Sequence, residues 1–221
     1  MAGENAPAVQ AAIAARRSIR AYRPEAIAPA TLDRLLQAAV MAPSAHHRQP
    51  WRFVLLREAG AKAALAAAMG RRLAEDRSRD GDPAEAIRRD VERSAARITG
   101  APQLVLVCLT LEAMDSYPDR RRAEAEFLMA VQSTAMAAQN LLLAAAAEGL
   151  AACWMCAPLF CPATVRAALA LPEAWEPQGL VTLGWPAAAG RLRPRKPLDA
   201  VTVERDSLFV PSLRPCQKAK A

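Results

Sequence analysis

Several stretches carry apolar residues at helical spacing. Residues 7–17 form one, and residues 28–43 form another, in which leucine and alanine share one face. Thr31 is expected to cap the second helix, and Pro43 to end it. Residues 59–99 are highly charged and also predict helix, interrupted at the turn signal "DGDP".

Short apolar runs between these helices predict strands. They are "WRFVLLR" at 51–57, "QLVLVCLT" at 103–110, "LAACWMC" at 150–156 and "QGLVTLGWP" at 178–186. The second is continuously apolar, which is typical of a central strand. The segment "CPATVRAAL" predicts a short helix between the last two strands.

A long helix is expected from about Arg121 to Glu148, ending at Gly149, which suits a left-handed C-terminal cap. Its middle is nearly free of charge, so we expect burial on most sides. Polar residues such as Gln139 interrupt its apolar run, which favours a core helix over a membrane span.

Alternating helices and short strands favour an α+β protein with a central mixed sheet flanked by helices. We expect a single domain over residues 1–221, with residues 205–221 as a tail. Apolar residues in that tail, including Phe209, favour packing on a partner subunit. The N-terminus lacks the pattern of a secretory signal, so a cytoplasmic location without membrane association is expected.

The chain has a net charge of +7 and a pI near 9.6, which suits an anionic partner. Several arginine clusters lie among acidic residues, as in "RRLAEDRSRDGD" and "RRAEAE", which is typical of a solvated helix face. Few aromatic residues accompany the basic ones, so nucleic-acid binding is the weaker alternative and no nucleic-acid partner is expected.

Five cysteines occur in a chain without an export signal, which favours free thiols. Cys153 and Cys156 have the spacing of a redox pair, but they lie in a predicted strand and not at a helix start, which disfavours that role. The histidines and cysteines match no zinc-ligand spacing, so no metal site is expected.

Two clusters of basic residues have few acidic residues near them in the sequence. Arg16, Arg17 and Arg20 flank Ser18 and would suit a phosphate, although arginines at a helix C-terminus also complement the helix dipole. Arg193 and Arg195 alternate across Pro194, so both side chains could reach one anion.

The order of six segments carries a resemblance to a known family. They are "RRSIRAYRP", "APSAHHRQPWRFVLL", the long helix, "EGLAACWMCAP", "VTLGWP" and "RLRPRKPLD". In these, from about residue 14 to residue 205, the chain resembles the nitroreductase superfamily of flavin mononucleotide (FMN) enzymes. The resemblance implies an intertwined homodimer with exchanged C-terminal arms and two flavins at its interface.

The resemblance also implies which residues contact FMN. Arg16, Ser18 and Arg20 would come from the N-terminal segment, with Arg17 beside them, and Arg193 and Arg195 would complete the phosphate site. Met155, Cys156 and Ala157 would line the ring. The partner subunit would contribute the loop of Pro43, Ser44, Ala45, His47 and Gln49.

Two positions depart from the usual pattern. Many relatives have asparagine at His47 and glutamate at Cys156, so the ring environment here is less acidic. For His46 an exposed loop position is an equal alternative to a site role. Because the flavin performs the hydride chemistry, no catalytic side-chain nucleophile is expected.

The segments "HHRQPWRF", "FCPATVRAALALPEAWEPQGLVTLGWP" and "RPRKPLD" resemble most the C-terminal reductase domain of the deazaflavin cofactor biosynthesis enzyme. A reduced nicotinamide or deazaflavin donor is expected, with a nitroaromatic, a quinone or a dehydro precursor of deazaflavin as acceptor. A dimethylbenzimidazole synthase of the same superfamily, which fragments flavin, is the enzymatic alternative.

Overall fold

The computed structural model describes residues 6–204. The chain divides into two units, one up to Arg191 and one from Leu192 onward. The first contains α1 (Ala6–Ala15), α2 (Pro29–Val40), η1 (Ala45–His47), β1 (Trp51–Leu56), α3 (Ala59–Arg79), α4 (Ala84–Thr99), β2 (Gln103–Leu109), α5 (Arg120–Ala147), β3 (Ala151–Met155), η2 (Ala157–Phe160), α6 (Pro162–Leu169) and β4 (Glu176–Gly184). The described part of the second contains the short 3-10 helix η3 (Leu198–Ala200).

The four strands form one sheet in the order β1-β2-β4-β3. Every pair of neighbouring strands is antiparallel, so the mixed sheet expected from the sequence is wrong for the described strands. Within residues 6–204, the only parallel contact is an isolated bridge between Ser18 and Ala152. Because β3 is last in the strand order, it is an edge strand. The bridge to Ser18 lies on its outer side.

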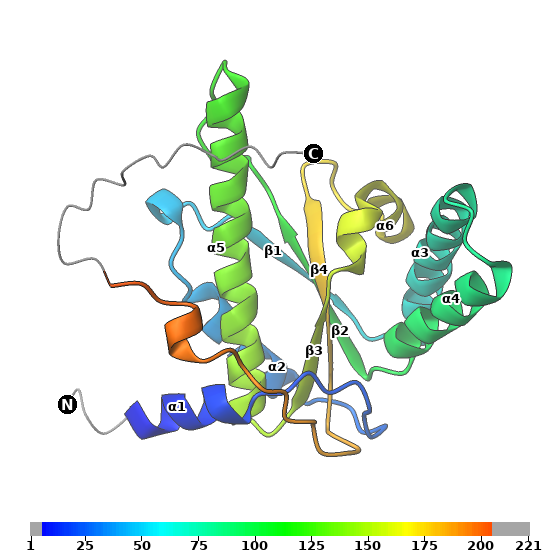
Figure 1. The fold of residues 1–221 in the computed structure, drawn as a ribbon, viewed down its shortest axis with the longest axis horizontal. Helices are drawn as coiled ribbons and strands as arrows, with labels where there is room; N and C mark the ends of the chain where they lie inside the picture. Colours follow the sequence, from blue (N-terminus) through cyan, green and yellow to red (C-terminus); the bar gives the residue numbers. More distant parts are fainter. Residues whose placement is uncertain (1–5, 205–221) are drawn as a thin grey trace, which may run out of the picture. The chain divides into compact units, whose positions relative to one another are not determined.

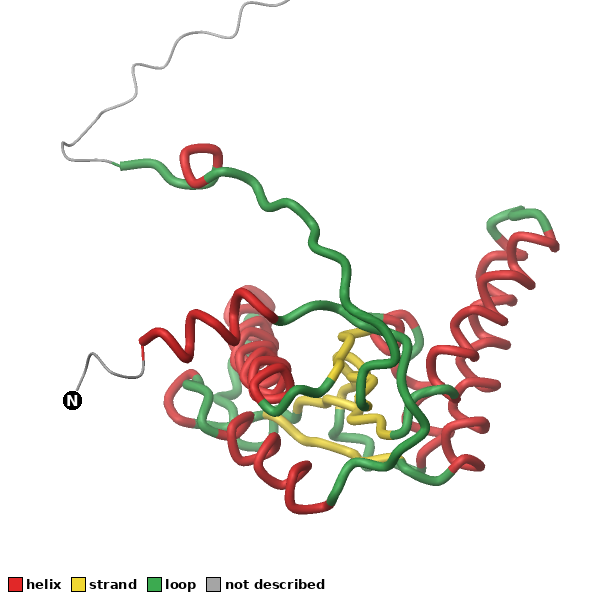
Figure 2. The backbone as a smooth tube through the Cα atoms, turned by 90° about the horizontal axis from the view of Figure 1, so that it is seen from below, coloured by secondary structure: helices red, strands yellow, loops and turns green. Residues whose placement is uncertain are grey.

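Helices cover both faces of the sheet. Val105 and Val107 of β2 pack with α2 and α5, whereas Leu104, Leu106 and Cys108 pack with α3, α4 and α6. Alternate residues of a strand point to opposite faces, which is why β2 is buried along its whole length. Figure 2 shows the strands between α5 on one side and the α3–α4 hairpin on the other.

α5 lies across one face of the sheet (Figure 1). By length and composition alone it could cross a membrane, but Ala130, Ala137, Leu141 and Ala145 are fully buried in the core. Its outer side carries exposed apolar residues, so burial on most sides, as expected from the sequence, is wrong. Within residues 6–204 it packs on the sheet, α1, α2 and η1, whereas Phe127, Leu128 and Met136 remain exposed.

The start of α2 also differs from the sequence-based expectation. Ala28 is the N-cap residue and makes no side-chain capping bond, and Pro29 begins the helix. The hydroxyl of Thr31 instead accepts a hydrogen bond from the Arg34 guanidinium at 3.1 Å. Proline is well suited to the first helical turn, because its fixed φ angle is helical and it lacks an N–H there. Thr31 as the cap is therefore wrong.

Candidate functional site

The N-terminal segment is held at the open side of the edge strand β3. The backbone N–H of Ile19 donates to the carbonyl of Ala152 at 3.2 Å, next to the bridge between Ser18 and Ala152. Further along, the N–H of Arg23 donates to the carbonyl of Trp185 at 2.8 Å. The N-terminal segment is thereby placed beside β3 and the end of β4, although these residues are far apart in sequence.

Tyr22 fastens this segment to the sheet. Its hydroxyl lies 2.6 Å from the hydroxyl of Thr182 on β4 and donates to the carbonyl of Ile19 at 2.8 Å. Burial raises the pKa of Tyr22 to about 12, although the hydrogen bond with Thr182 offsets part of that rise. The phenol therefore stays protonated and remains a donor at neutral pH.

A cavity of about 350 Å³ opens where this segment, β3 and α5 meet. Arg16 and Ser18 line it from the N-terminal segment, and Ala152 and Trp154 line it from β3. The middle of α5 supplies the remaining wall: Ala135, Ala138, Gln139 and Leu142. The volume is within the ~300–1,000 Å³ typical of cofactor and ligand sites. A guanidinium, a hydroxyl and an indole ring on apolar walls suit a ligand with an anionic end and a flat body.

Trp154, which lines this cavity, is followed by the last residue of β3 and the start of η2. The Trp154 indole Nε1 donates to the sulfur of Cys156 at 3.1 Å. Met155 ends β3 half-buried, Cys156 is exposed, and Ala157 begins η2. The three residues predicted to line a flavin ring therefore form one short, partly accessible segment.

The cysteines of the described residues are free thiols. Cys153 is buried within β3, whereas Cys156 lies exposed beyond the end of that strand. Burial raises the pKa of Cys153, and the nearby guanidinium of Arg20 partly offsets the rise. Arg20 thus lies beside β3, on the segment that also carries Arg16 and Ser18.

Arg17 makes a different set of contacts. Its guanidinium donates to the carbonyl of Ala14 and, at 2.8 Å, to that of Arg16. These are carbonyl groups at the C-terminal end of α1, so Arg17 has the helix-terminus role that was the alternative for this cluster. A flavin contact from Arg17 stays a prediction.

The loop of Pro43, Ser44, Ala45, His47 and Gln49 is tightly held. The Ser44 hydroxyl accepts from the backbone N–H of Gln49 at 3.1 Å, and the N–H of Ala45 donates to the hydroxyl of Ser133 on α5 at 3.2 Å. The side chains of His47 and Gln49 also meet at 3.0 Å. None of these five predicted residues lines the cavity of Arg16 and Ser18, and a contact with the partner's flavin stays a prediction.

This loop also has an unusual backbone. His46, His47 and Gln49 have φ angles of 49°, 56° and 48°, in the left-handed region that residues other than glycine rarely adopt. Each such residue costs about 1–3 kcal/mol and persists where surrounding contacts enforce it. Strained backbone of this kind is concentrated at ligand sites, which agrees with a binding role for the loop.

Arg193 and Arg195 lie in the second unit and are exposed. The Arg195 guanidinium donates to the carbonyl of Arg193 at 3.0 Å. Joint binding of one anion by these arginines and Arg16 stays a prediction.

Trp154 and Gln139 were absent from the sequence-predicted site. The alternation of β3 could have indicated Trp154, because it shares a strand face with Ala152. No sequence signal distinguishes Gln139 from other polar residues of α5.

Residues 13–185 match the model of the nitroreductase family. The chain belongs to the nitroreductase family. The α+β fold expected from the resemblance is therefore confirmed. The chain is 34% identical over 195 residues to an NADH dehydrogenase of Thermus thermophilus, covering 86% of this chain and 92% of the relative.

Two further relatives bear on the site. A 5,6-dimethylbenzimidazole synthase of Rhodospirillum rubrum is 32% identical over 186 residues, covering 77% of this chain and 78% of the relative. A crystal structure from Desulfovibrio desulfuricans, described as a nitroreductase in complex with FMN, superposes with a TM-score of 0.68. It is 30% identical, and the match covers 89% of this chain and 96% of that chain.

Proposed function

We propose that this protein is an FMN-dependent oxidoreductase that is reduced and reoxidised in alternation. The observation that carries the proposal is the meeting of Arg16 and Ser18 with Trp154 in one cavity on the edge strand. Family membership and a structural relative crystallised with FMN support the same cofactor. The residues fit it, because the cavity combines anion donors with a flat apolar wall.

Each of these residues has a distinct task. The Arg16 guanidinium and the Ser18 hydroxyl would hold the phosphate, with Arg193 and Arg195 completing that site. Trp154, Met155 and Ala157 would exclude water from one side of the ring. Arg20 would stabilise negative charge at the pyrimidine edge, and the backbone N–H groups of Cys156 and Ala157 would donate to the central ring nitrogen. The bound flavin supplies the hydride chemistry.

A homodimer completes this proposal. Phe127, Leu128 and Met136 on α5 and Val9 and Ile13 on α1 are large apolar residues exposed to solvent. Exposed apolar surface of this kind marks interaction sites. The loop of Pro43 to Gln49, attached to α5 through Ser133, would then reach the partner's flavin. The C-terminal arm predicted at 205–221 lies outside the described residues.

Reduced nicotinamide is the proposed electron donor, which agrees with the name of the Thermus thermophilus relative. A nitroaromatic or a quinone is the proposed acceptor. Reduction of a dehydro precursor of deazaflavin is a narrower proposal, supported by the segment resemblance alone, with reduced deazaflavin as the alternative donor.

One relative favours a second function. The similarity to a 5,6-dimethylbenzimidazole synthase makes fragmentation of FMN by oxygen the alternative. Incubating the protein with reduced FMN and oxygen, then separating products by chromatography, distinguishes the two: dimethylbenzimidazole supports the second function, and intact FMN supports the first.

The main test is flavin binding followed by turnover. The purified full chain is expected to be yellow or to bind added FMN, and NADH or NADPH should bleach the flavin absorption, which an acceptor then restores. A protein that takes up no FMN would contradict the proposal, and calibrated gel filtration tests the homodimer.

A further inference from the structure

The loop between α2 and β1, residues 43–49, has a backbone that its own residues disfavour. His46, His47 and Gln49 have left-handed φ angles. Within the loop, the backbone N–H of Gln49 donates to the Ser44 hydroxyl, and the N–H of His47 donates to the Ser44 carbonyl at 3.0 Å. Left-handed backbone is unfavourable for residues other than glycine, so contacts from outside the loop must help to enforce it.

Ser133 on α5 makes the first of these contacts, and it is only 1% exposed. Its hydroxyl donates to the carbonyl of Met129 at 2.7 Å, one turn earlier in the helix, and accepts from the backbone N–H of Ala45 at 3.2 Å. The bond to Met129 uses the single proton of the hydroxyl and leaves its lone pairs for the loop. Ser133 is therefore a fixed acceptor for the loop backbone.

A second contact reaches the loop from the same side of α5. Arg48 donates from Nη2 to Oδ1 of Asp115 at 2.7 Å, and the backbone N–H of Asp115 donates to Oε1 of Glu126 at 3.0 Å. Glu126 is buried on α5 and lies about two turns before Ser133. Residues two turns apart share one side of a helix, so that side of α5 holds the loop at two points.

The two ends of the loop are fixed in the core, so these contacts act on its middle. Ala42 and Trp51, which flank the loop, pack with Ala137 of α5. Residues 46–49, between these ends, are exposed to solvent. The attachments to Ser133 and Asp115 are therefore placed to decide the conformation of the exposed part.

The two attachments differ in strength. The side chains of Arg48 and Asp115 are 40% and 42% exposed, so water screens their ion pair. Loss of the Ser133 hydroxyl would instead leave the N–H of Ala45 without its acceptor at a partly buried position, which is more costly. Ser133 should therefore have the larger effect on the loop.

We propose that Ser133 is a positioning residue for flavin binding, which holds the loop in the left-handed conformation that reaches the partner's flavin. The Arg48–Asp115 pair assists it. The inference rests on the proposed function, which assigns the flavin contact to this loop. Ser133 itself does not touch the flavin, and its effect on FMN binding passes through the backbone of Ala45 and the residues after it.

Four variants of the full chain test this role. Ser133→Ala removes the hydroxyl, whereas Ser133→Thr keeps it and adds a methyl group. Thr134→Val is the matched control, because Thr134 is also 1% exposed, and its hydroxyl has no hydrogen-bond partner within residues 6–204. Asp115→Ala removes the exposed ion pair and leaves the Ser133 contact in place.

Hydrogen exchange followed by mass spectrometry, without FMN, measures whether the loop is held. Ser133→Ala should speed exchange of the peptide covering residues 43–50 by about fivefold or more, while the peptide of β2 keeps its protection. Ser133→Thr and Thr134→Val should exchange there like the wild type, even if the free energy of unfolding changes. Asp115→Ala should have a smaller effect, which high salt diminishes.

Fluorescence titration then measures FMN binding by the same variants. Ser133→Ala should bind FMN about fivefold more weakly, or worse, and Ser133→Thr and Thr134→Val should stay within about twofold of the wild type. Unchanged loop exchange in Ser133→Ala, or equal loss of FMN affinity in Ser133→Ala and Thr134→Val, would overturn the inference. Faster loop exchange with wild-type FMN affinity would overturn it too and leave the proposed function standing. A wild type that binds no FMN would instead sink the proposed function.

Discussion

The indole ring of Trp154 on β3 lies across Gly179 on β4, so closely that a Cβ atom on Gly179 would come within 2.1 Å of the ring. The absent side chain of Gly179 thus allows Trp154 to lie flat on the sheet and form a wall of the Arg16 cavity. A substituent at position 179 would push the ring outward.

Gly179→Ala is therefore expected to lower the free energy of unfolding by about 1–3 kcal/mol, as overpacked sites do, and to weaken FMN binding. Urea denaturation and a flavin titration measure the two effects. Gly60→Ala is the matched control, because a Cβ there meets nothing within 4 Å, and helical alanine should stabilise by about 0.5–1 kcal/mol. Unchanged FMN affinity in Gly179→Ala would remove Trp154 from the flavin site.

Arg16→Ala and Arg195→Ala are each expected to weaken FMN binding by about tenfold while leaving the unfolding midpoint close to that of the wild type. Each removes charge-assisted hydrogen bonds of about 1.5–3 kcal/mol to the proposed phosphate. Fluorescence titration at low and high salt measures the dissociation constants. Arg120→Ala, which removes an exposed ion pair with Glu124 on α5, is the control. Wild-type affinity in Arg195→Ala would place the phosphate elsewhere.

Tyr22→Phe tests the attachment of the N-terminal segment. It should lower the free energy of unfolding by about 0.5–1.5 kcal/mol through loss of the bonds to Ile19 and Thr182. The wild-type pKa of Tyr22 is raised from 10.0 to about 12, so the unfolded chain ionises first as pH rises. The stability that Tyr22 contributes is thus fully present below pH 10 and is lost progressively between pH 10 and 12.

Denaturation at several pH values checks this dependence. Tyr22→Phe should lose less stability than the wild type over the same interval, and parallel curves would contradict the assigned burial.

His46→Gly should relieve backbone strain in the loop after α2. Because His46 has a φ of 49°, glycine is expected to raise the free energy of unfolding by about 1 kcal/mol. Ala45→Gly, at a neighbouring position outside the left-handed region, should lower it instead. If both substitutions destabilise, the loop conformation carries no strain. If His46→Gly is more stable but binds FMN more weakly, the strained backbone of this loop is needed for FMN binding.

The order of helices and strands along the chain was predictable from local sequence patterns. The interruption at "DGDP" separates α3 from α4, and the left-handed φ of Gly149, 75°, marks the end of α5 as expected. The errors arose where tertiary context decided the outcome. Proline replaced Thr31 at the start of α2, and strand direction depended on connections that no periodicity encodes.

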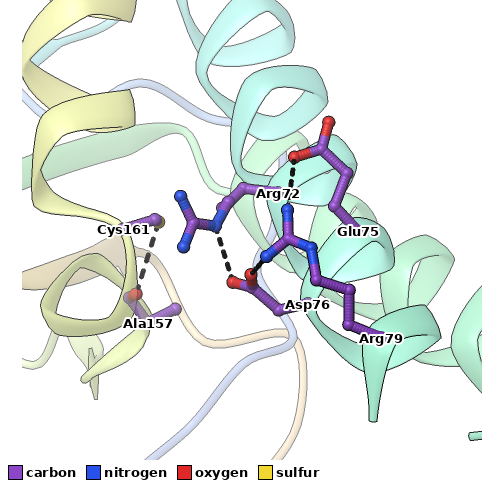
Figure 3. A network of polar contacts seen from close by, with 6 residues as sticks. All are labelled: Arg72, Glu75, Asp76, Arg79, Ala157 and Cys161. Carbon is purple, nitrogen blue, oxygen red and sulfur yellow. Dashed lines mark hydrogen bonds and ion pairs between the residues drawn. The ribbon is translucent and has the colours of Figure 1, made fainter. Parts of the chain in front are cut away.

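The sequence and the structure agree on where the cavity of Arg16 and Ser18 lies only in so far as both place basic residues there. The charge of the cluster around Arg16 drew attention to this segment, and the structure brings Arg16 and Ser18 beside β3, whereas their contact with FMN stays a prediction. A cavity of about 230 Å³ between α3 and the segment after β3, lined by Arg72 and Cys161 among others (Figure 3), was not foreseen, because residues 71–80 have the charge pattern of a solvated helix face. Only the packing of α3 beside the segment after β3 turns one of those arginines toward an apolar wall.

The bridge between Ser18 and Ala152 also has a consequence for biosynthesis. The segment that carries Ser18 must wait for β3, which follows much later in the chain, before it finds its place. Contacts between such distant residues form late and slowly. A nascent chain would therefore be unable to form the cavity of Arg16 and Trp154 until β3 has been synthesised, which makes cofactor uptake a late event in biosynthesis.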